Sequence, residues 1–214
     1  MSIPYNTMMA DVVSSDTESR KRGRPREFDI DAALDKAVRV FRERGYHATS
    51  ITDLLNAMEL ASGSVYKAFK DKQAIFVAAF DREEAVRGEK LQRIISTVKS
   101  GRDRIREVLI FYAKSSYGAE GKRGCLLVGS VTELATLDGC VAQRVTAALH
   151  KSETLIINLI RQGRSDGSIS ASVDSKITAR LLLCLLQGMR VIGKTGRECA
   201  EMTAVVDAAM KFLG

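Results

Sequence analysis

The sequence predicts an all-α protein with a small N-terminal head and a larger C-terminal body. Apolar residues recur at helical spacing along most of the chain, and no convincing run of alternating strand-type residues occurs. Both prolines, at positions 4 and 25, precede the helical region, so neither interrupts it. We therefore expect a polar N-terminal segment with a basic arm over residues 1–26, a helix-turn-helix head over residues 27–72 and a helical body over residues 73–214.

A basic arm is expected just before the head. Residues 1–19 are polar and lack periodicity, which is typical of disorder. Residues 20–26 then place five cations in seven positions, with a glycine and a proline that oppose helix formation. An extended basic segment fits the narrow minor groove of DNA, whose negative potential attracts arginine, and Arg22–Pro25 resembles an AT-hook. We expect Arg22 and Arg24 to contact DNA.

Three helices are expected to form the head. The first covers about Asp31–Arg44 and ends at Gly45. Two shorter helices follow over residues 50–72, where Ser50 is able to cap the first of them and Asp53 to complete a capping box. The inward stripes consist of Leu34, Ala37, Val38 and Phe41, then Ile51, Leu54, Leu55 and Met58, then Val65 and Phe69. Two short helices joined by a tight turn are the pattern of a helix-turn-helix.

At these residues the chain resembles the TetR/AcrR-type transcriptional regulators. The matching positions are Phe41, Gly45, Tyr46, Ala48–Ile51, Asp53, Leu54, Gly63–Tyr66, Phe69 and Lys72. The resemblance implies a DNA-binding head, a ligand-binding helical body and a homodimer. It also implies that the protein is a regulator released from DNA by a small-molecule inducer, and more often a repressor than an activator.

The resemblance also implies roles for individual residues of the head. The N-terminal end of a recognition helix approaches bases closely, and small residues there leave room for the approach. Residues expected to face the major groove are Ser62, Gly63, Ser64 and Lys67. Residues expected to hold phosphates are Thr49, Ser50, Tyr66 and Lys72. The chain departs from the family at Glu59, where glycine is usual in the turn, so we expect a strained or differently shaped turn there.

The body is expected to consist of helices only. They cover about 71–88, capped by Asp71, and then 103–117, 125–135, 140–162, 174–192 and 198–212. The helix over 174–192 is apolar nearly all round, which indicates burial on more than one side. Its excess apolar residues are Leu181, Leu182, Cys184, Leu185 and Leu186. We therefore expect the last two helices to pair with those of a second copy in a four-helix interface.

An inducer pocket is expected within the body. A ligand changes operator affinity only by binding two conformations differently, so its pocket must touch helices that also position the head. The candidate lining residues are Phe111, Tyr112, Tyr117, Cys125 and Met189. Few charges fall on these helix faces, which favours a small, largely apolar ligand.

Cys125 has two interpretations. Arg123 and Lys122 precede it, and it is expected to open a helix, where positive charge and the helix dipole favour a reactive thiolate. In that case the inducer would be an electrophile or oxidant trapped at Cys125. A cysteine between glycine and leucines is, however, also typical of a small core residue. Both interpretations stay open at the level of sequence.

One motif favours a different class of protein, an NTPase. Residues 188–195 fit the P-loop pattern G-x-x-x-x-G-K-[ST], which works only between a buried strand and a helix N-terminus. The preceding residues are spaced like a helix, so we interpret the motif as a helix C-terminus, with Gly193 as its cap and Lys194 as a partner of the helix dipole. No catalytic signature occurs elsewhere, and we expect neither enzymatic activity nor a cofactor.

Composition narrows the remaining choices. The net charge of +7 favours anionic partners. Four separated cysteines and two histidines show no metal-ligand spacing, and neither a signal peptide nor a membrane-spanning run is evident. We expect a cytoplasmic, homodimeric regulator that reads a palindromic operator, with a nonspecific nucleoid-binding protein as the other DNA-binding alternative.

Overall fold

The computed structural model describes residues 29–133 and 139–214 and is helical throughout, with no strand within these ranges. The head consists of α1 (Ile30–Arg44), α2 (Ile51–Met58) and α3 (Ser62–Ala68). The body consists of α4 (Lys72–Ile95), α5 (Gly101–Lys114), α6 (Gly118–Arg123), α7 (Leu126–Thr132), α8 (Gly139–Ser165), α9 (Ser175–Gly193) and α10 (Cys199–Met210), followed by a 3₁₀ turn over Lys211–Leu213. The prediction of an all-α fold is confirmed, and no described helix is long and apolar enough to cross a membrane.

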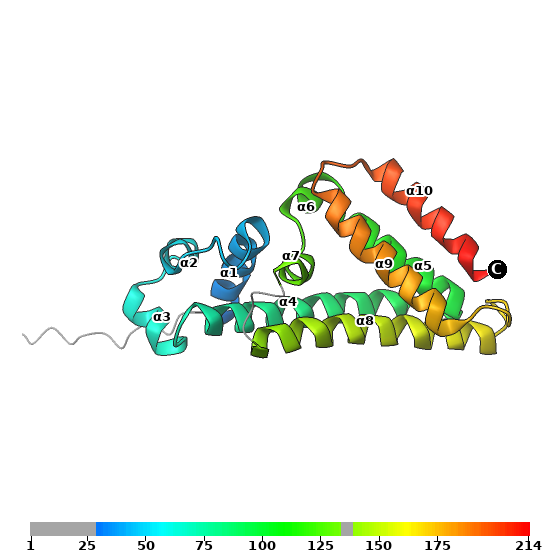
Figure 1. Cartoon of the computed structure of the whole chain (residues 1–214), viewed down its shortest axis with the longest axis horizontal. Helices are drawn as coiled ribbons and strands as arrows, with labels where there is room; N and C mark the ends of the chain where they lie inside the picture. The colour runs from blue at the N-terminus through cyan, green and yellow to red at the C-terminus, as the bar shows by residue number, and fades with distance from the viewer. Residues whose placement is uncertain (1–28, 134–138) are drawn as a thin grey trace, which may run out of the picture.

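The molecule is elongated, with the head at one end and α10 at the other (Figure 1). α4 and α8 run beside each other along the long axis, and α9, α5 and α10 pack above them in the view of Figure 1. Two hydrophobic clusters fill the interior. One joins the head helices to the start of α4, to α7 and to the first half of α8, and the other joins α5, α9, α10 and the second half of α8.

Aromatic side chains form the centre of the head. Phe76 of α4 lies edge-on to Phe41 of α1 and to Tyr46, with ring centroids 5.0 Å apart in both pairs. Such edge-to-face pairs add to the energy of burying the rings. The start of α4 therefore belongs to the head core, and α4 continues from there into the body.

The capping predictions in the head are confirmed. The Ser50 hydroxyl accepts a hydrogen bond from the Asp53 amide at 3.1 Å, and the Asp53 carboxylate accepts one from the Ser50 amide at 2.9 Å. Hydrogen bonds from Ser50 lower the pKa of Asp53 to about 2. Asp71 caps α4 by accepting from the Ala74 amide at 2.8 Å. Local hydrogen bonding thus determines where α2 and α4 begin.

Two predictions for the body helices need correction. α4 ends at Ile95 and not near Gly88, because one glycine costs only about 1 kcal/mol and Leu91 and Ile95 anchor the extra turns by burial. α6 was not expected. The prediction that Cys125 opens a helix is confirmed, because it is the N-cap of α7, which begins at Leu126. The predicted end of that helix, near residue 135, lies outside the described residues.

Gly193 also has a different role from the predicted one. It is the last residue of α9, and Lys194 is the C-cap in a right-handed conformation. A Cβ added to Gly193 would collide with the backbone carbonyl of Ser116. Glycine is required there for close helix packing, which no local pattern indicates.

The turn of the helix-turn-helix confirms the concern about Glu59. Glu59 lies in the left-handed region at φ 57° and ψ 38°, which makes it the one non-glycine residue of positive φ among those described. Its carboxylate forms an exposed ion pair with Lys36, 2.8 Å long. The turn therefore has the shape that glycine favours, at a steric cost to glutamate.

We predict that Glu59→Gly is more stable to unfolding than Glu59→Ala by about 1 kcal/mol, because glycine avoids the Cβ clash of the left-handed conformation. Both variants lose the ion pair with Lys36, so their difference isolates the backbone effect. Urea unfolding followed by circular dichroism measures it. Equal midpoints for the two variants would contradict a strained turn.

Candidate nucleic-acid interface and ligand pockets

α3 presents the surface expected to meet DNA. Its inner side is anchored by Val65 and by Phe69, which follows the helix, and both are buried. Ser62, Gly63, Tyr66 and Lys67 are exposed, and Ser64 is half-buried. α2 and α3 lie at the end of the molecule farthest from α10 (Figure 1). An elongated partner is thus able to approach α3 without meeting the body.

Two of the predicted phosphate ligands point into the head. The Thr49 hydroxyl is buried and donates to the Gly45 carbonyl at 2.6 Å. The Lys72 ammonium donates to the carbonyls of Tyr46 and Thr49, both at 3.0 Å, and lies 4.4 Å from the centre of the Tyr46 ring. Lys72 thus ties the start of α4 to the head, and Thr49 ties the start of α2 to the residue that follows α1, so both side chains have supporting positions.

Of the remaining predicted DNA contacts, Ser50 lies within the described residues and Arg22 and Arg24 do not. Ser50 is occupied as the N-cap of α2. Lys70, directly after α3, is exposed beside the recognition surface and was not predicted. Its spacing of one helical turn from Lys67 could have indicated a second cation beside the recognition helix.

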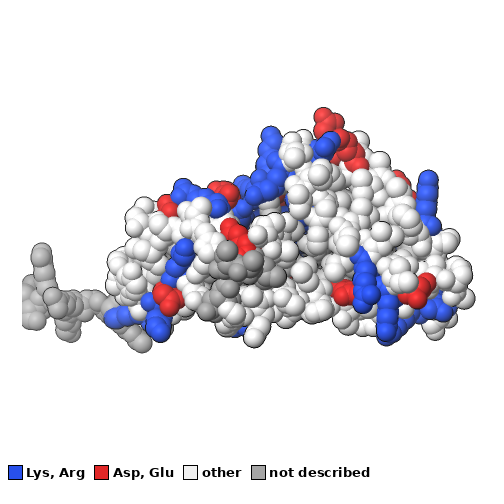
Figure 2. Space-filling view, in the orientation of Figure 1, with Lys and Arg blue, Asp and Glu red and all other residues white. Residues whose placement is uncertain are grey.

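Charge alone does not distinguish the α3 surface. In the view of Figure 2, basic and acidic side chains are interspersed over both the head and the body. Several of the cations are paired, as Lys36 is with Glu59 and Arg44 with Asp53. Helix position and exposure, more than net charge, therefore identify the candidate interface.

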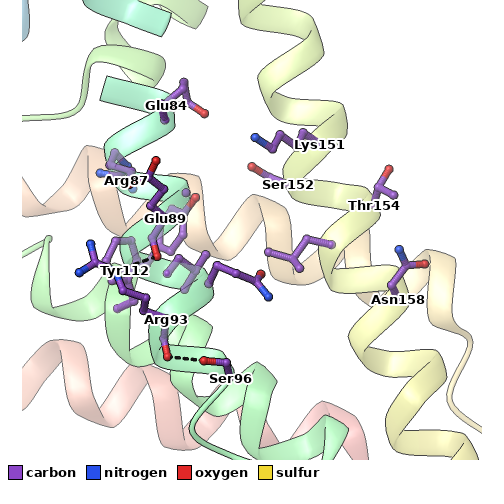
Figure 3. Close-up of a pocket in the computed structure, with 16 residues that line it drawn as sticks. Glu84, Arg87, Glu89, Arg93, Ser96, Tyr112, Lys151, Ser152, Thr154 and Asn158 are labelled. Atoms are coloured by element: carbon purple, nitrogen blue, oxygen red, sulfur yellow. Dashed lines mark hydrogen bonds between the residues drawn. The ribbon is translucent and has the colours of Figure 1, made fainter. Parts of the chain in front are cut away.

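A large cavity of about 860 Å³ lies between α4, α5 and α8 (Figure 3). We call it the body pocket. Glu84 of α4 faces Lys151 of α8 across it, and Arg87 and Ser152 also line it. Its volume suits a drug-sized ligand. A ligand held here would touch α4, which also forms part of the head core.

Aromatic and charged groups meet on one wall of the body pocket. The guanidinium of Arg87 lies 5.5 Å from the ring centre of Phe111 and 5.3 Å from that of Tyr112, in cation–π range. Burial raises the pKa of the Glu84 carboxyl and that of the Tyr112 hydroxyl. The pocket therefore combines an apolar surface with groups that are able to donate or accept hydrogen bonds.

The predicted ligand residues do not all gather in this pocket. Phe111 and Tyr112 line it, whereas Tyr117 begins α6, Cys125 precedes α7 and Met189 lies in the body core. The expectation of nearly uncharged walls is not met, because charged side chains from α4 and α8 project into the cavity. The expected walls were the helices over 103–117 and 174–192 and the region of Cys125; of these only α5 lines the cavity, and α4 and α8 supply the rest of its wall.

Cys125 lies in an unexpected cationic environment. It is buried and lies near the guanidinium groups of Arg87 and Arg190, which come from α4 and α9. Arg190 is only 1% exposed, and burial lowers the pKa of its guanidinium. No role was predicted for Arg190 from the sequence. Its position as a lone charge on an otherwise apolar helix face could have indicated a buried cation.

The carbonyl of Gly124 connects the head to the far side of the body. It accepts hydrogen bonds from Arg42 of α1, at 3.1 Å from Nε and 2.7 Å from Nη2, and from Arg190 of α9 at 2.6 Å. The P-loop-like residues themselves belong to α9 up to Gly193. A helix thus precedes the motif where a phosphate-binding loop requires a strand.

Two family models match most of the described chain. The model described as "Bacterial regulatory proteins, tetR family" matches residues 33–79. The model described as "Tetracyclin repressor-like, C-terminal domain" matches residues 101–209. The first covers the helix-turn-helix and the start of α4, and the second covers α5 to α10.

Individual proteins are similar along most of their length. The HTH-type transcriptional repressor ComR of Escherichia coli (strain K12) is 26% identical over 200 residues, which cover 93% of this chain and 95% of ComR. A cysteine mutant of the TetR family transcriptional regulator CifR, complexed with 26 bp of double-strand operator DNA, is 31% identical. That structure has a TM-score of 0.76 and covers 88% of this chain and 98% of CifR. The reduced form of E. coli NemR, at 21% identity and a TM-score of 0.75, shares the fold and covers 87% of this chain and 98% of NemR.

Proposed function

Because the chain belongs to the tetR family of bacterial regulatory proteins, we propose that it is a homodimeric transcriptional repressor that binds a palindromic operator and is released by a small ligand. The observation that carries the proposal is the exposed α3 surface on a buried Val65–Phe69 anchor. The similarity to ComR, a repressor, and to CifR, which is bound to operator DNA in its structure, supports it.

DNA reading is proposed to follow from the side chains of α3. Ser62, Gly63, Ser64 and Lys67 would approach base edges, since they lie on or near the exposed side of the helix. Tyr66 would hold a phosphate through its hydroxyl, and phosphate contacts set register without reading sequence. Thr49 and Lys72 would contribute indirectly, Thr49 by tying the start of α2 to Gly45 and Lys72 by tying the start of α4 to Tyr46 and Thr49.

We predict that Tyr66→Ala weakens binding to the operator and to unrelated duplexes alike, whereas Lys67→Ala changes sequence preference. The operator is first obtained by selection from random-sequence DNA, and gel-shift titrations at several salt concentrations then measure each variant. Lys99→Ala, an exposed lysine of the body, is the control and leaves both affinities unchanged. Unchanged affinity of Tyr66→Ala at every salt concentration would remove Tyr66 from the interface. Failure to select any preferred site would favour the nonspecific nucleoid-binding alternative.

Dimerisation is proposed to use α9 and α10. Leu182 and Leu186 of α9 are buried in the body core, while Ile177 is 67% exposed and Leu181 44% exposed on the opposite side of the helix. Cys184 and Val191 continue this exposed stripe, and Phe212 lies exposed after α10. An exposed apolar stripe of this kind marks an interaction surface. A second copy would cover it symmetrically.

We predict that Leu181→Asp converts the dimer to a folded monomer at micromolar concentration, because it would bury two unpaired carboxylates near a two-fold axis. Ile30→Asp is the matched control, since Ile30 is similarly exposed at 47% but lies on the head. Sedimentation velocity distinguishes the two species. A wild-type chain that sediments as a monomer would refute the proposed interface directly.

The inducer is proposed to bind reversibly in the body pocket. α4 forms one wall of this pocket and also contacts the head through Phe76 and Lys72. A ligand that displaces α4 would therefore change the position of α3 in each half of the dimer. Cys125 is buried and does not line the pocket, which favours reversible binding over covalent trapping at this thiol.

We predict that Cys125→Ser and wild type respond equally when 1,4-benzoquinone is added to the protein–operator complex and DNA release is followed by fluorescence anisotropy. Burial slows attack by the Cys125 thiol, so the substitution removes no sensor. Cys184→Ser, which removes an exposed thiol, controls for modification elsewhere. Loss of release in Cys125→Ser alone, with normal operator binding, would instead identify this thiol as the switch.

A further inference from the structure

A second cavity, of about 770 Å³, lies at the junction between the head and the body. We call it the junction pocket. α1 contributes Arg39 and Arg42, α4 contributes Lys90, and α5 contributes Lys114. Unlike the body pocket, it involves no residue of α8 and is lined directly by the head.

Three of its cations form no direct salt bridge with a described residue, although Arg39 lies close enough to Asp35 and Glu59 to lower the pKa of both carboxyls. Arg39, Lys90 and Lys114 form no ion pair with any residue that the structure describes. They come from three different helices and converge on one concave surface. All three are exposed, and cations that line one concave surface give it a positive potential. Such a surface attracts an anion.

Most acidic residues of the junction pocket are paired with arginines other than Arg39. Asp35 accepts two hydrogen bonds from Arg82, at 2.7 and 2.8 Å. Glu120 pairs with Arg42 and with Arg123. Glu83 lies 4.0 Å from Nε of Arg42, and burial raises the pKa of its carboxyl. Only Glu107 remains without an ion pair among the described residues, against three such cations.

The junction pocket also has an apolar surface. Val38, Ile94 and Ile110 line it, together with Val86, which is 48% exposed. Exposed valine beside unpaired cations is unfavourable for the free protein and suits a ligand with two parts. The cations would hold an acidic group, while the apolar side chains would cover a hydrocarbon portion.

From this combination we propose that the junction pocket is a second effector site, which binds an amphipathic organic anion such as a medium-chain carboxylate. The acidic group lies among Arg39, Lys90 and Lys114, and the chain lies on Val38 and Val86. This site is separate from the body pocket proposed for the inducer. Binding of the anion does not depend on whether the chain acts as a repressor.

The two pockets share a wall. Arg87 and Phe111 line both cavities, with the guanidinium stacked over the ring. An anion in the junction pocket attracts Arg87 toward itself and so changes the surface that the body pocket offers its ligand. Occupancy of one site therefore alters affinity at the other, and this coupling is reciprocal.

Isothermal titration calorimetry with decanoate, at concentrations below micelle formation, tests the proposal on the full chain. We expect one saturable site per chain for decanoate and none for decyltrimethylammonium, which has the same tail and the opposite charge. The double variant Lys90→Ala/Lys114→Ala is expected to weaken decanoate binding about tenfold or more, because charge-assisted contacts are lost. Both lysines are exposed on helices, so circular dichroism should show an unchanged fold.

Matched variants locate the site. Lys151→Ala removes one cation from the body pocket, and Lys99→Ala removes one from the open surface; both should leave decanoate affinity within twofold of wild type. Loss of binding in Lys151→Ala but not in the double variant would place the anion in the body pocket and overturn the proposal. Equal binding of the cationic probe, or no saturable decanoate binding, would overturn it as well. None of these measurements uses DNA. A chain that fails to bind an operator could therefore still bind decanoate, and the two proposals can fail separately.

Discussion

The continuity of α4 is the constraint on which the rest of the structure depends. A straight helix transmits displacement along its length, because its backbone hydrogen bonds resist bending. α4 runs over 24 residues from Lys72 to Ile95 without interruption. Its first turns are held by Phe76 in the aromatic centre of the head, and its later turns form walls of both pockets. Whatever moves this helix therefore moves the head as well.

The carbonyl of Gly124 provides a second connection between the head and the body. A buried guanidinium is costly unless its N–H groups find acceptors. Arg190 is almost fully buried and donates to this carbonyl through Nη2, whereas its Nε and Nη1 have no hydrogen-bond partner among the described residues; Arg42 of the head donates to the same carbonyl. Since one acceptor holds cations from α1 and α9, a shift of α9 changes the environment of α1. The proposed dimer helix is thus linked to the head by a short polar path.

Two pockets on either side of Arg87 give the protein a means of integrating two ligands. The body pocket lies toward α8, and the junction pocket lies toward α1. Arg87 has favourable partners on both sides, namely the aromatic rings over which it stacks and the carboxylates of Glu83 and Glu84. A side chain with several nearly equivalent partners is easily redirected by a new charge. The position of Arg87 is consequently the simplest way in which one site senses the other.

The sequence by itself determined the features that depend on neighbours within one helical turn. The all-α class, the capping box of Ser50 and Asp53, the Asp71 cap and the exposed residues of α3 all follow from spacing and local hydrogen bonding. The strained turn at Glu59 was expected from the family resemblance, because glycine is usual at this position in the family.

Only the tertiary structure decided which distant residues meet. It turned Lys72 into the head, brought Gly193 against Ser116 and surrounded Cys125 with Arg87 and Arg190. It also placed the body pocket beside Phe111 and Tyr112 but away from Tyr117 and Met189. These contacts join residues far apart in the chain, and they depend on helix lengths and packing angles. No local pattern of residue types encodes those quantities, because each helix adopts its final position only against the others.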